Sequence, residues 1–178
     1  MSKLRKKFKK NILLTGGAGY IGSTVAYDLI KIGHNVTIID NLSTGYKKLI
    51  PKKAHFLKTD INNLSNLKKL FKLKKFDLVM HFAAYIKVDE SVKKPNKYYV
   101  NNFNKTKIFL NACLNHGIDK IIFSSTAAVY GNKSYKIKET DSLSPKSPYA
   151  SSKLKCEKFI IRKSKQKKWK HIVLRYFN

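Results

Sequence analysis

Residues 11–23, with the sequence NILLTGGAGYIGS, decide the fold because they join an apolar run to a glycine-rich turn and the start of an amphipathic segment. The run 11–15 predicts a short buried strand, and the apolar spacing of residues 20–32 predicts a helix that Gly33 would end. A glycine-rich turn between a buried strand and a helix is typical of a βαβ unit that binds a dinucleotide. The sequence favours this unit over a purely structural glycine turn.

Three glycines in this turn, Gly16, Gly19 and Gly22, lie three residues apart, and each has a distinct expected role. The first permits the tight turn, the second lets a pyrophosphate approach the backbone, and the third lets the helix pack closely against the strand. The free N–H groups and the partial positive charge at the helix N-terminus would face the phosphates.

An acidic residue stands where such a unit needs one to select its cofactor. The second apolar run, residues 36–39, ends at Asp40. A carboxylate at this place can accept hydrogen bonds from an adenosine ribose, and its charge would repel the 2′-phosphate of NADP. The sequence therefore predicts NAD as the cofactor.

Strand-like runs and helical segments alternate along the rest of the chain. Strands that are apolar on both faces and alternate with helices indicate a parallel sheet covered on both sides. We therefore predict an α/β fold, a Rossmann-type doubly wound parallel sheet with helices on both faces. The remaining predicted strands are 55–59, 78–82, 121–124 and 171–176, the remaining predicted helices are 64–71, 106–116 and 149–163, and a long polar loop, 132–148, is expected to be functional.

The start of the last predicted helix carries a tyrosine and a lysine four residues apart. Ser147 can cap this helix, and Pro148 suits its first position. Tyr149 and Lys153 would then share one face, where the ammonium and the positive charge of an oxidised nicotinamide would favour the phenolate. The pair predicts a tyrosine general base, whereas the same spacing without a dinucleotide turn would indicate an ordinary surface pair.

The composition allows one well-buried domain and excludes several functional classes. The chain has 178 residues, of which 43% are hydrophobic, and no apolar run approaches the roughly 18 residues of a membrane helix. The basic start lacks the long apolar core of a secretory signal. Cys113 and Cys156 lack metal-ligand spacing, so we expect no metal site and two free thiols in a reducing cytoplasm.

The formal net charge of +28 raises the alternative of a nucleic-acid-binding protein. Of the 38 basic residues, however, only Arg5, Arg162 and Arg175 are arginines. The recognition of bases and phosphates favours the planar guanidinium of arginine over the ammonium of lysine. The lysines are also spread along the whole chain. We therefore expect a solvated lysine-rich surface without a nucleic-acid partner, and a polyanion contact through the basic tail, residues 1–10, stays open.

Beyond the basic tail, residues 11–178 resemble the extended short-chain dehydrogenase/reductase family, and within it the UDP-glucose 4-epimerase type. That family continues into a smaller C-terminal domain that binds the nucleotide and shapes the sugar pocket. The resemblance thus implies that this chain is the NAD-binding Rossmann domain, truncated before the substrate-binding domain. The matching segments are 15–23, 40–42, 60–61, 81–84, 88–91, 94–95, 98–99, 101–102, 123–131, 147–153 and 174–178.

The resemblance also implies which residues surround the cofactor. Asp60 and Ile61 would flank the adenine, and the segment after the fourth strand would lie beneath the cofactor. Together with the three glycines, the implied NAD site comprises Tyr20, Ile21, Asp40, Asn41, Asp60, Ile61, Phe82, Ala83, Ala84, Asn101, Tyr149 and Lys153.

The reaction implied by the resemblance is a 4-epimerisation of a UDP-sugar. Tyr149 would remove the 4-hydroxyl proton while the C4 hydride passes to NAD, and Thr126 would hydrogen-bond the 4-oxygen. The 4-keto sugar would then turn over and take the hydride back on its other face, which interconverts UDP-glucose and UDP-galactose in galactose metabolism. Phe177 and Asn178 match the start of a segment that meets the sugar nucleotide, and the family also implies a homodimer as an option.

Several positions separate this chain from its relatives. Dehydratases of the family carry an Asp–Glu pair after the threonine and decarboxylases carry a Glu, whereas Ala127 and Ala128 have no proton to give. Lys105 stands where the family usually has glycine, and it would either disturb helix packing or point to solvent. Ile86 replaces a lysine of some epimerases. A related enzyme with a different sugar, or an NAD-binding remnant without catalysis, stays open.

Overall fold

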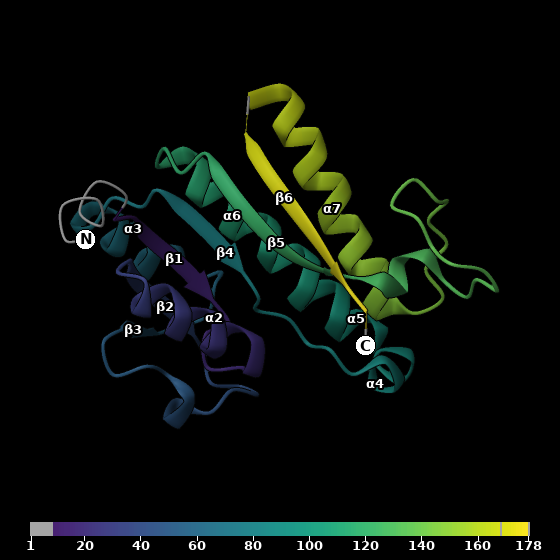
Figure 1. Ribbon diagram of the computed structural model, residues 1–178, viewed down its shortest axis with the longest axis horizontal. Coiled ribbons are helices and arrows are strands. Elements are labelled where there is room, and N and C mark those ends of the chain that lie inside the picture. Colours follow the sequence, from purple (N-terminus) through teal and green to yellow (C-terminus); the bar gives the residue numbers. More distant parts are fainter. Residues whose placement is uncertain (1–8, 168, 178) are drawn as a thin grey trace.

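Six short apolar runs form one fully parallel sheet in the computed structural model, which describes residues 9–167 and 169–177 (Figure 1). The strand order is β3-β2-β1-β4-β5-β6, so the chain winds outward from β1 in one direction and then from β4 in the other. This doubly wound arrangement confirms the fold predicted from the sequence. The strands are β1 (Asn11–Thr15), β2 (Asn35–Asp40), β3 (His55–Lys58), β4 (Leu78–His81), β5 (Lys120–Thr126) and β6 (Lys170–Tyr176).

The register of the central strands brings their carboxyl ends to one level. Thr15 at the end of β1 lies opposite Ile39 of β2 on one side and opposite His81 of β4 on the other. The strand order reverses between β1 and β4, so the loops that leave these strands diverge. This divergence opens the crevice in which doubly wound sheets bind their ligands.

The four predicted helices are present, with ends that differ from the predicted ones by at most four residues. The segment between β4 and α6 was not predicted to be helical, because Pro95 interrupts it and its pieces are too short to show a helical period. Within the described residues, no helix is long and apolar enough to cross a membrane. The helices are α2 (Tyr20–Lys31), η1 (Lys47–Leu49), α3 (Leu64–Leu73), α4 (Val88–Lys93), α5 (Pro95–Tyr98), the π-helical η2 (Tyr99–Lys105), α6 (Thr106–Asn115), η3 (Ala127–Tyr130) and α7 (Pro148–Lys167).

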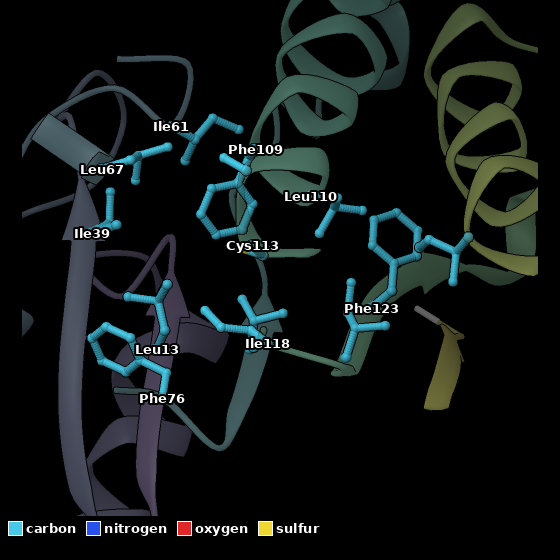
Figure 2. Packing of buried hydrophobic residues seen from close by; sticks show 14 of the residues in the cluster. Leu13, Ile39, Ile61, Leu67, Phe76, Phe109, Leu110, Cys113, Ile118 and Phe123 are labelled. Atoms are coloured by element: carbon cyan, nitrogen blue, oxygen red, sulfur yellow. The ribbon is translucent and has the colours of Figure 1, made fainter. Parts of the chain in front are cut away.

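The larger hydrophobic core lies between one face of the sheet and the helices α3, α6 and α7. Leu13 and Phe123 of the strands share this core with Phe109 of α6, as Figure 2 shows. Successive side chains of a strand point to opposite faces, so the neighbours of Leu13 belong to the second core. That core packs Ile12 and Leu14 against α2 on the other face of the sheet.

The edge strand β6 is covered on one face only. Val173 packs against the larger core, whereas Ile172, whose side chain points to the other face, is 55% exposed. The smaller core on that face includes residues of β1, β2, β4 and α2, and it does not extend to β6 within the described residues. The β6 end of this face is therefore an apolar surface without a covering element in the described part of the chain.

A buried histidine ties the central strands to α6. The two ring nitrogens of His81 contact the hydroxyls of Thr15 and Thr106 at 2.7 and 2.9 Å. The ring is also stacked between Phe109 and Phe123. Burial, aided by the charge of Lys153, lowers the pKa of His81 to about 3, so the imidazole stays neutral in the folded protein.

We predict that this histidine makes the protein acid-labile. An unfolded histidine takes up a proton below about pH 6.5, whereas folded His81 does not until about pH 3. Since the unfolded state binds more protons in this window, the free energy of unfolding should fall with falling pH, by about 1.4 kcal/mol per unit from this group. Urea unfolding of the wild type and His81→Gln, compared from about pH 7 to about pH 4, should show a difference that shrinks as the pH falls. A constant difference would contradict this assignment.

Candidate functional site

A cavity of about 720 Å³ opens where the loops after β1, β2, β4 and β5 meet, at the carboxyl ends of the strands. Its volume lies in the range of ligand-binding cavities. It brings together residues that are far apart in the sequence, and it includes nearly all of the predicted site. The predicted residues that line it are Gly16, Gly19, Tyr20, Ile21, Gly22, Asp40, Asn41, Asp60, Ile61, Phe82, Ala83, Ala84, Asn101, Thr126, Tyr149 and Lys153.

One predicted substrate residue does not join this group. Phe177 lies beyond the end of β6, is 67% exposed and does not line the cavity. The neighbouring Tyr176 lines it instead, and burial raises the pKa of its phenol. Asn178 lies outside the described residues.

The glycine turn has the geometry of a phosphate cradle. A Cβ at Gly22 would lie 2.3 Å from the carbonyl oxygen of Gly16, so the protein itself requires glycine there. Gly19 is different: its backbone is extended, and its Cβ would meet nothing nearer than 3.4 Å. Packing within the protein therefore leaves room for a side chain at Gly19, whereas a ligand lying against the backbone would not.

The start of α2 is arranged to receive an anion. Gly19 caps the helix without a side-chain hydrogen bond, and the first turn contains no acidic residue. The first amides of a helix lack partners within the helix and carry its partial positive charge. A phosphate placed against this turn would satisfy both, which supports the predicted role of the cradle.

Asp40 is held in a fixed orientation at the end of β2. Its Oδ2 accepts a hydrogen bond from the amide of Ala18 at 3.0 Å, and its Oδ1 accepts one from the amide of Leu42 at 2.8 Å. Leu42 has a positive φ of 60°, an unusual conformation for a branched residue. Each carboxylate oxygen keeps a further lone pair, so Asp40 can still accept a hydrogen bond from a ribose hydroxyl.

Asp60 joins a small polar network at the wall of the cavity. Its Oδ2 accepts hydrogen bonds from Lys105 Nζ at 2.6 Å and from Asn41 Nδ2 at 3.0 Å. The expectation that Lys105 points to solvent is wrong, because its ammonium lies against Asp60. The segment that ends at Lys105 is π-helical and leads directly into α6.

The π-helical turn η2 places two asparagines side by side with different roles. Asn101 lines the cavity, whereas the buried Asn102 joins three segments. Asn102 accepts a hydrogen bond from the amide of Tyr85 and donates to the carbonyl of Tyr85 and to Ser152 Oγ. It thereby fixes the loop after β4 against α7, which carries the tyrosine–lysine pair. π-turns inside helices often mark functional sites.

The tyrosine–lysine pair and Thr126 meet in the cavity as predicted. The Ser147 hydroxyl accepts a hydrogen bond from the amide of Ala150 at 3.1 Å, which caps the start of α7 and sets the direction of Tyr149. Thr126 ends β5, and its hydroxyl accepts a hydrogen bond from the amide of Ala128 at 3.2 Å. The phenol of Tyr149 contacts the Thr126 side chain.

The charge arrangement of the pair differs from the expected one. Lys153 donates from Nζ to the carbonyl oxygen of Ser124 at 2.7 Å, and burial lowers the pKa of its ammonium to about 8. Burial raises the pKa of Tyr149, and the hydrogen bond with Thr126 offsets this rise only in part. In the protein alone the pKa of Tyr149 therefore lies above its usual value. The predicted lowering includes the charge of an oxidised nicotinamide and stays a prediction.

Comparison with known proteins identifies the family. The model of the NAD dependent epimerase/dehydratase family matches residues 12–178. The chain belongs to this family.

Individual relatives agree with this assignment. The chain is 44% identical over 168 residues to a UDP-glucose 4-epimerase of Lacticaseibacillus casei, an alignment that covers 94% of this chain and 51% of the relative. A solved UDP-Glc/GlcNAc 4-epimerase from Campylobacter jejuni is 41% identical, with a TM-score of 0.91 over 95% of this chain and 54% of that structure. A UDP-glucose 4-epimerase from Brucella ovis, solved in complex with NAD, is 36% identical with a TM-score of 0.91, covering 95% and 52%. The chain thus spans about half the length of the curated relatives it matches.

A buried network that contacts the cavity residue Ser125 was missed by the sequence reasoning. Glu157, only 1% exposed, accepts hydrogen bonds from Arg175 of β6 and from Ser125 Oγ. Arg175 also donates from Nη1 to the hydroxyl of Tyr130 at 2.6 Å. Two signals could have revealed the network: Glu157 lies one helical turn after Lys153, and Arg175 is one of only three arginines in a chain that otherwise uses lysine.

The second and third glycines of the turn, Gly19 and Gly22, allow a paired test. In Gly22→Ala, the new methyl group would press on a backbone carbonyl, so we expect a loss of about 1–3 kcal/mol in the free energy of unfolding and a loss of NAD binding. Gly19→Ala has room for its methyl group within the protein, so it should unfold like the wild type but bind NAD at least about tenfold more weakly. Urea unfolding and calorimetric titration with NAD separate the two effects. Wild-type affinity in Gly19→Ala would contradict the cradle.

The burial of the Lys153 ammonium should lower the stability of the protein, although the proposed chemistry of the site needs this charge. The pKa of Lys153 is lowered from 10.5 to about 8, so the folded protein at neutral pH holds a charge that the unfolded chain holds more easily. Lys153→Met should therefore raise the free energy of unfolding at neutral pH by about 1–2 kcal/mol, after the lost hydrogen bond to Ser124 is allowed for. This difference should shrink between about pH 8 and about pH 10.5. In this range folded Lys153 loses its proton before unfolded Lys153 does, so the free energy of unfolding of the wild type rises.

The exposed Lys158 on the same helix provides the matched control for this test. Lys158→Met should change the free energy of unfolding by less than about 0.5 kcal/mol. Urea unfolding that finds Lys153→Met less stable than the wild type at neutral pH would contradict the lowered pKa.

Proposed function

We propose that the chain is the cofactor-binding half of an NAD-dependent UDP-glucose 4-epimerase, which interconverts UDP-glucose and UDP-galactose through a 4-keto intermediate. The observation that carries the proposal is that Thr126, Tyr149 and Lys153 line the same cavity as the glycine turn. Similarity to UDP-glucose 4-epimerases over 94% of the chain supports it.

The residues of the cavity fit NAD. The uncapped start of α2 and the bare backbone of Gly19 would receive the diphosphate. Asp40 would accept hydrogen bonds from the adenosine ribose and would repel the 2′-phosphate of NADP. The adenine would lie near Asp60 and Ile61, and the nicotinamide near Tyr149, as the chemistry requires.

The reaction assigns a separate task to each member of the trio. NAD, when bound, supplies a reversible two-electron acceptor for C4 of the sugar and a positive charge beside the phenol. Tyr149 accepts the proton of the 4-hydroxyl at its phenolic oxygen and returns it to the epimer. Thr126 positions the 4-oxygen through its hydroxyl, and Lys153, held by the Ser124 carbonyl, contributes a second positive charge that favours the phenolate.

The segment after Thr126 supports epimerisation rather than elimination. Ala127 and Ala128 begin η3 directly beside the catalytic threonine. Elimination of water from the sugar needs an acid to protonate the leaving hydroxyl, and alanine cannot supply a proton. Transient oxidation at C4 needs only the tyrosine and the cofactor, so it remains available to this site.

The proposal extends to a second domain and to the setting of the enzyme. We propose that residues 11–178 form the NAD-binding domain and that a substrate-binding half covers the apolar face of β6, where Ile172 is exposed. Phe177 and Asn178 would then meet the sugar nucleotide at the junction. Cys113 and Cys156 are free and buried, which suits a cytoplasmic enzyme of galactose metabolism. A homodimer without a nucleic-acid partner completes the proposal.

A second candidate function is 4-epimerisation of an N-acetylated sugar. The solved protein from Campylobacter jejuni is named a UDP-Glc/GlcNAc 4-epimerase, and it is 41% identical to this chain. UDP-galactose and UDP-N-acetylgalactosamine, supplied in parallel assays, distinguish the two candidates. A third reading, an NAD-binding remnant without catalysis, predicts no turnover with either sugar.

The proposed function is tested by turnover of UDP-galactose to UDP-glucose with NAD, measured on the full-length gene product. We expect Tyr149→Phe to reduce turnover by at least about 100-fold with little change in NAD affinity, because the phenylalanine keeps the ring and removes only the proton acceptor. The exposed Tyr27 of α2 provides the control, since Tyr27→Phe should leave turnover unchanged. The chain of residues 1–178 alone is expected to bind NAD weakly and to turn over little sugar. Near-normal turnover in Tyr149→Phe would contradict the mechanism.

A further inference from the structure

Lys105 forms an ion pair with Asp60, a residue that lines the cavity. The ammonium of Lys105 lies 2.6 Å from Asp60 Oδ2, and the two side chains are 24% and 26% exposed. Lys105 reaches Asp60 because it ends the π-helical turn η2, one helical turn after Asn101, which lines the cavity. The pair belongs to the part of the cavity where the proposed function places the adenine.

The carboxylate is oriented by three donors. Asp60 Oδ2 accepts hydrogen bonds from Lys105 and from Asn41 Nδ2, and Oδ1 accepts one from the amide of Asn62 at 3.2 Å. Burial raises the pKa of Asp60, but the hydrogen bond from Lys105 and the other donors outweigh this effect, so the net pKa lies below its usual value. At neutral pH the Lys105 ammonium therefore lies directly beside a carboxylate that lines the cavity.

A carboxylate alone discriminates between purine bases. It can only accept hydrogen bonds, so it pairs with the 6-amino group of adenine and repels the 6-oxygen of hypoxanthine. A lysine ammonium is a donor only and carries three hydrogens. Asp60 is the single acceptor that the described residues provide for Lys105, so further hydrogens of this ammonium can be donated to a ligand.

The two groups together read a base edge differently from the carboxylate alone. Adenine offers an amino donor beside ring-nitrogen acceptors, whereas a 6-oxopurine offers a carbonyl acceptor beside an N–H donor. One acceptor with an adjacent donor can pair with either base edge. The amino group of adenine would donate to Asp60, whereas the carbonyl oxygen of a 6-oxopurine would accept from Lys105.

We propose that Lys105 is a specificity-determining residue of the cofactor site, which adds a donor beside Asp60 and so admits 6-oxopurine dinucleotides as well as adenine dinucleotides. This proposal rests on the proposed function, since it requires that the cavity binds a purine dinucleotide.

The test compares NAD with nicotinamide hypoxanthine dinucleotide by calorimetric titration. The two ligands carry the same phosphates, so the ratio of their dissociation constants is insensitive to the overall charge of +28. The wild type should bind both within about threefold of each other. Lys105→Met keeps the length of the side chain but removes the donor, so the ratio should rise by about tenfold or more through weaker binding of the hypoxanthine ligand.

Two further variants identify the cause of any change. Lys105→Arg retains a donor beside Asp60 and should keep the wild-type ratio. Lys69→Met removes the same charge from an exposed position on α3 and should also keep it. A ratio that is unchanged in Lys105→Met, or a wild type that already rejects the hypoxanthine ligand by about tenfold or more, overturns the role of Lys105. Failure of the wild type to bind NAD at all would instead overturn the proposed function, and the inference with it.

Discussion

The close approach of Gly22 to the carbonyl of Gly16 is the constraint on which the rest of the site depends. It seats the first turn of α2 directly against the end of β1, with no room for even a methyl group between them. The strand order reverses here, so the parallel strands β2 and β4 lie on opposite sides of β1. The first amides of α2 therefore face a crevice whose other residues come from the loops after β2, β4 and β5. A looser contact would separate the positive end of the helix from that crevice.

Buried charged residues of α7 determine the structure of the opposite part of the cavity. Lys153 is buried at a cost, which its lowered pKa records, and its position is fixed by the Ser124 carbonyl. One turn later, Glu157 is neutralised by Arg175, which joins α7 to the edge strand β6. The arrangement gives up stability to place a cation near Tyr149. Such a conflict between stability and function is typical of sites that are selected for chemistry.

The fold, the glycine turn, Asp40 and the tyrosine–lysine pair could be predicted from the residues because they depend on local signals. The other predicted cavity residues followed from the resemblance to a family. Apolar runs, glycine spacing and the cap at Ser147 act over a few residues, so they can be recognised without coordinates. The helices between Val88 and Lys105 were missed because they are short and interrupted by Pro95. The pairing of Lys105 with Asp60 depends on which segments the sheet brings together, and sequence spacing carries no such information. The roles assigned to the cavity residues stay predictions until ligand binding is measured.

The most direct test of the account is a calorimetric titration of the chain with NAD at two salt concentrations. The account predicts one NAD per chain, with an affinity that falls only modestly at higher salt, because a shaped cavity and Asp40 contribute beside the phosphate contacts. A protein with a net charge of +28 can also bind polyanions without a site, and such binding would be multiple and steeply salt-dependent. Absence of binding, or binding of this second kind, would contradict the assignment of the cavity to a dinucleotide.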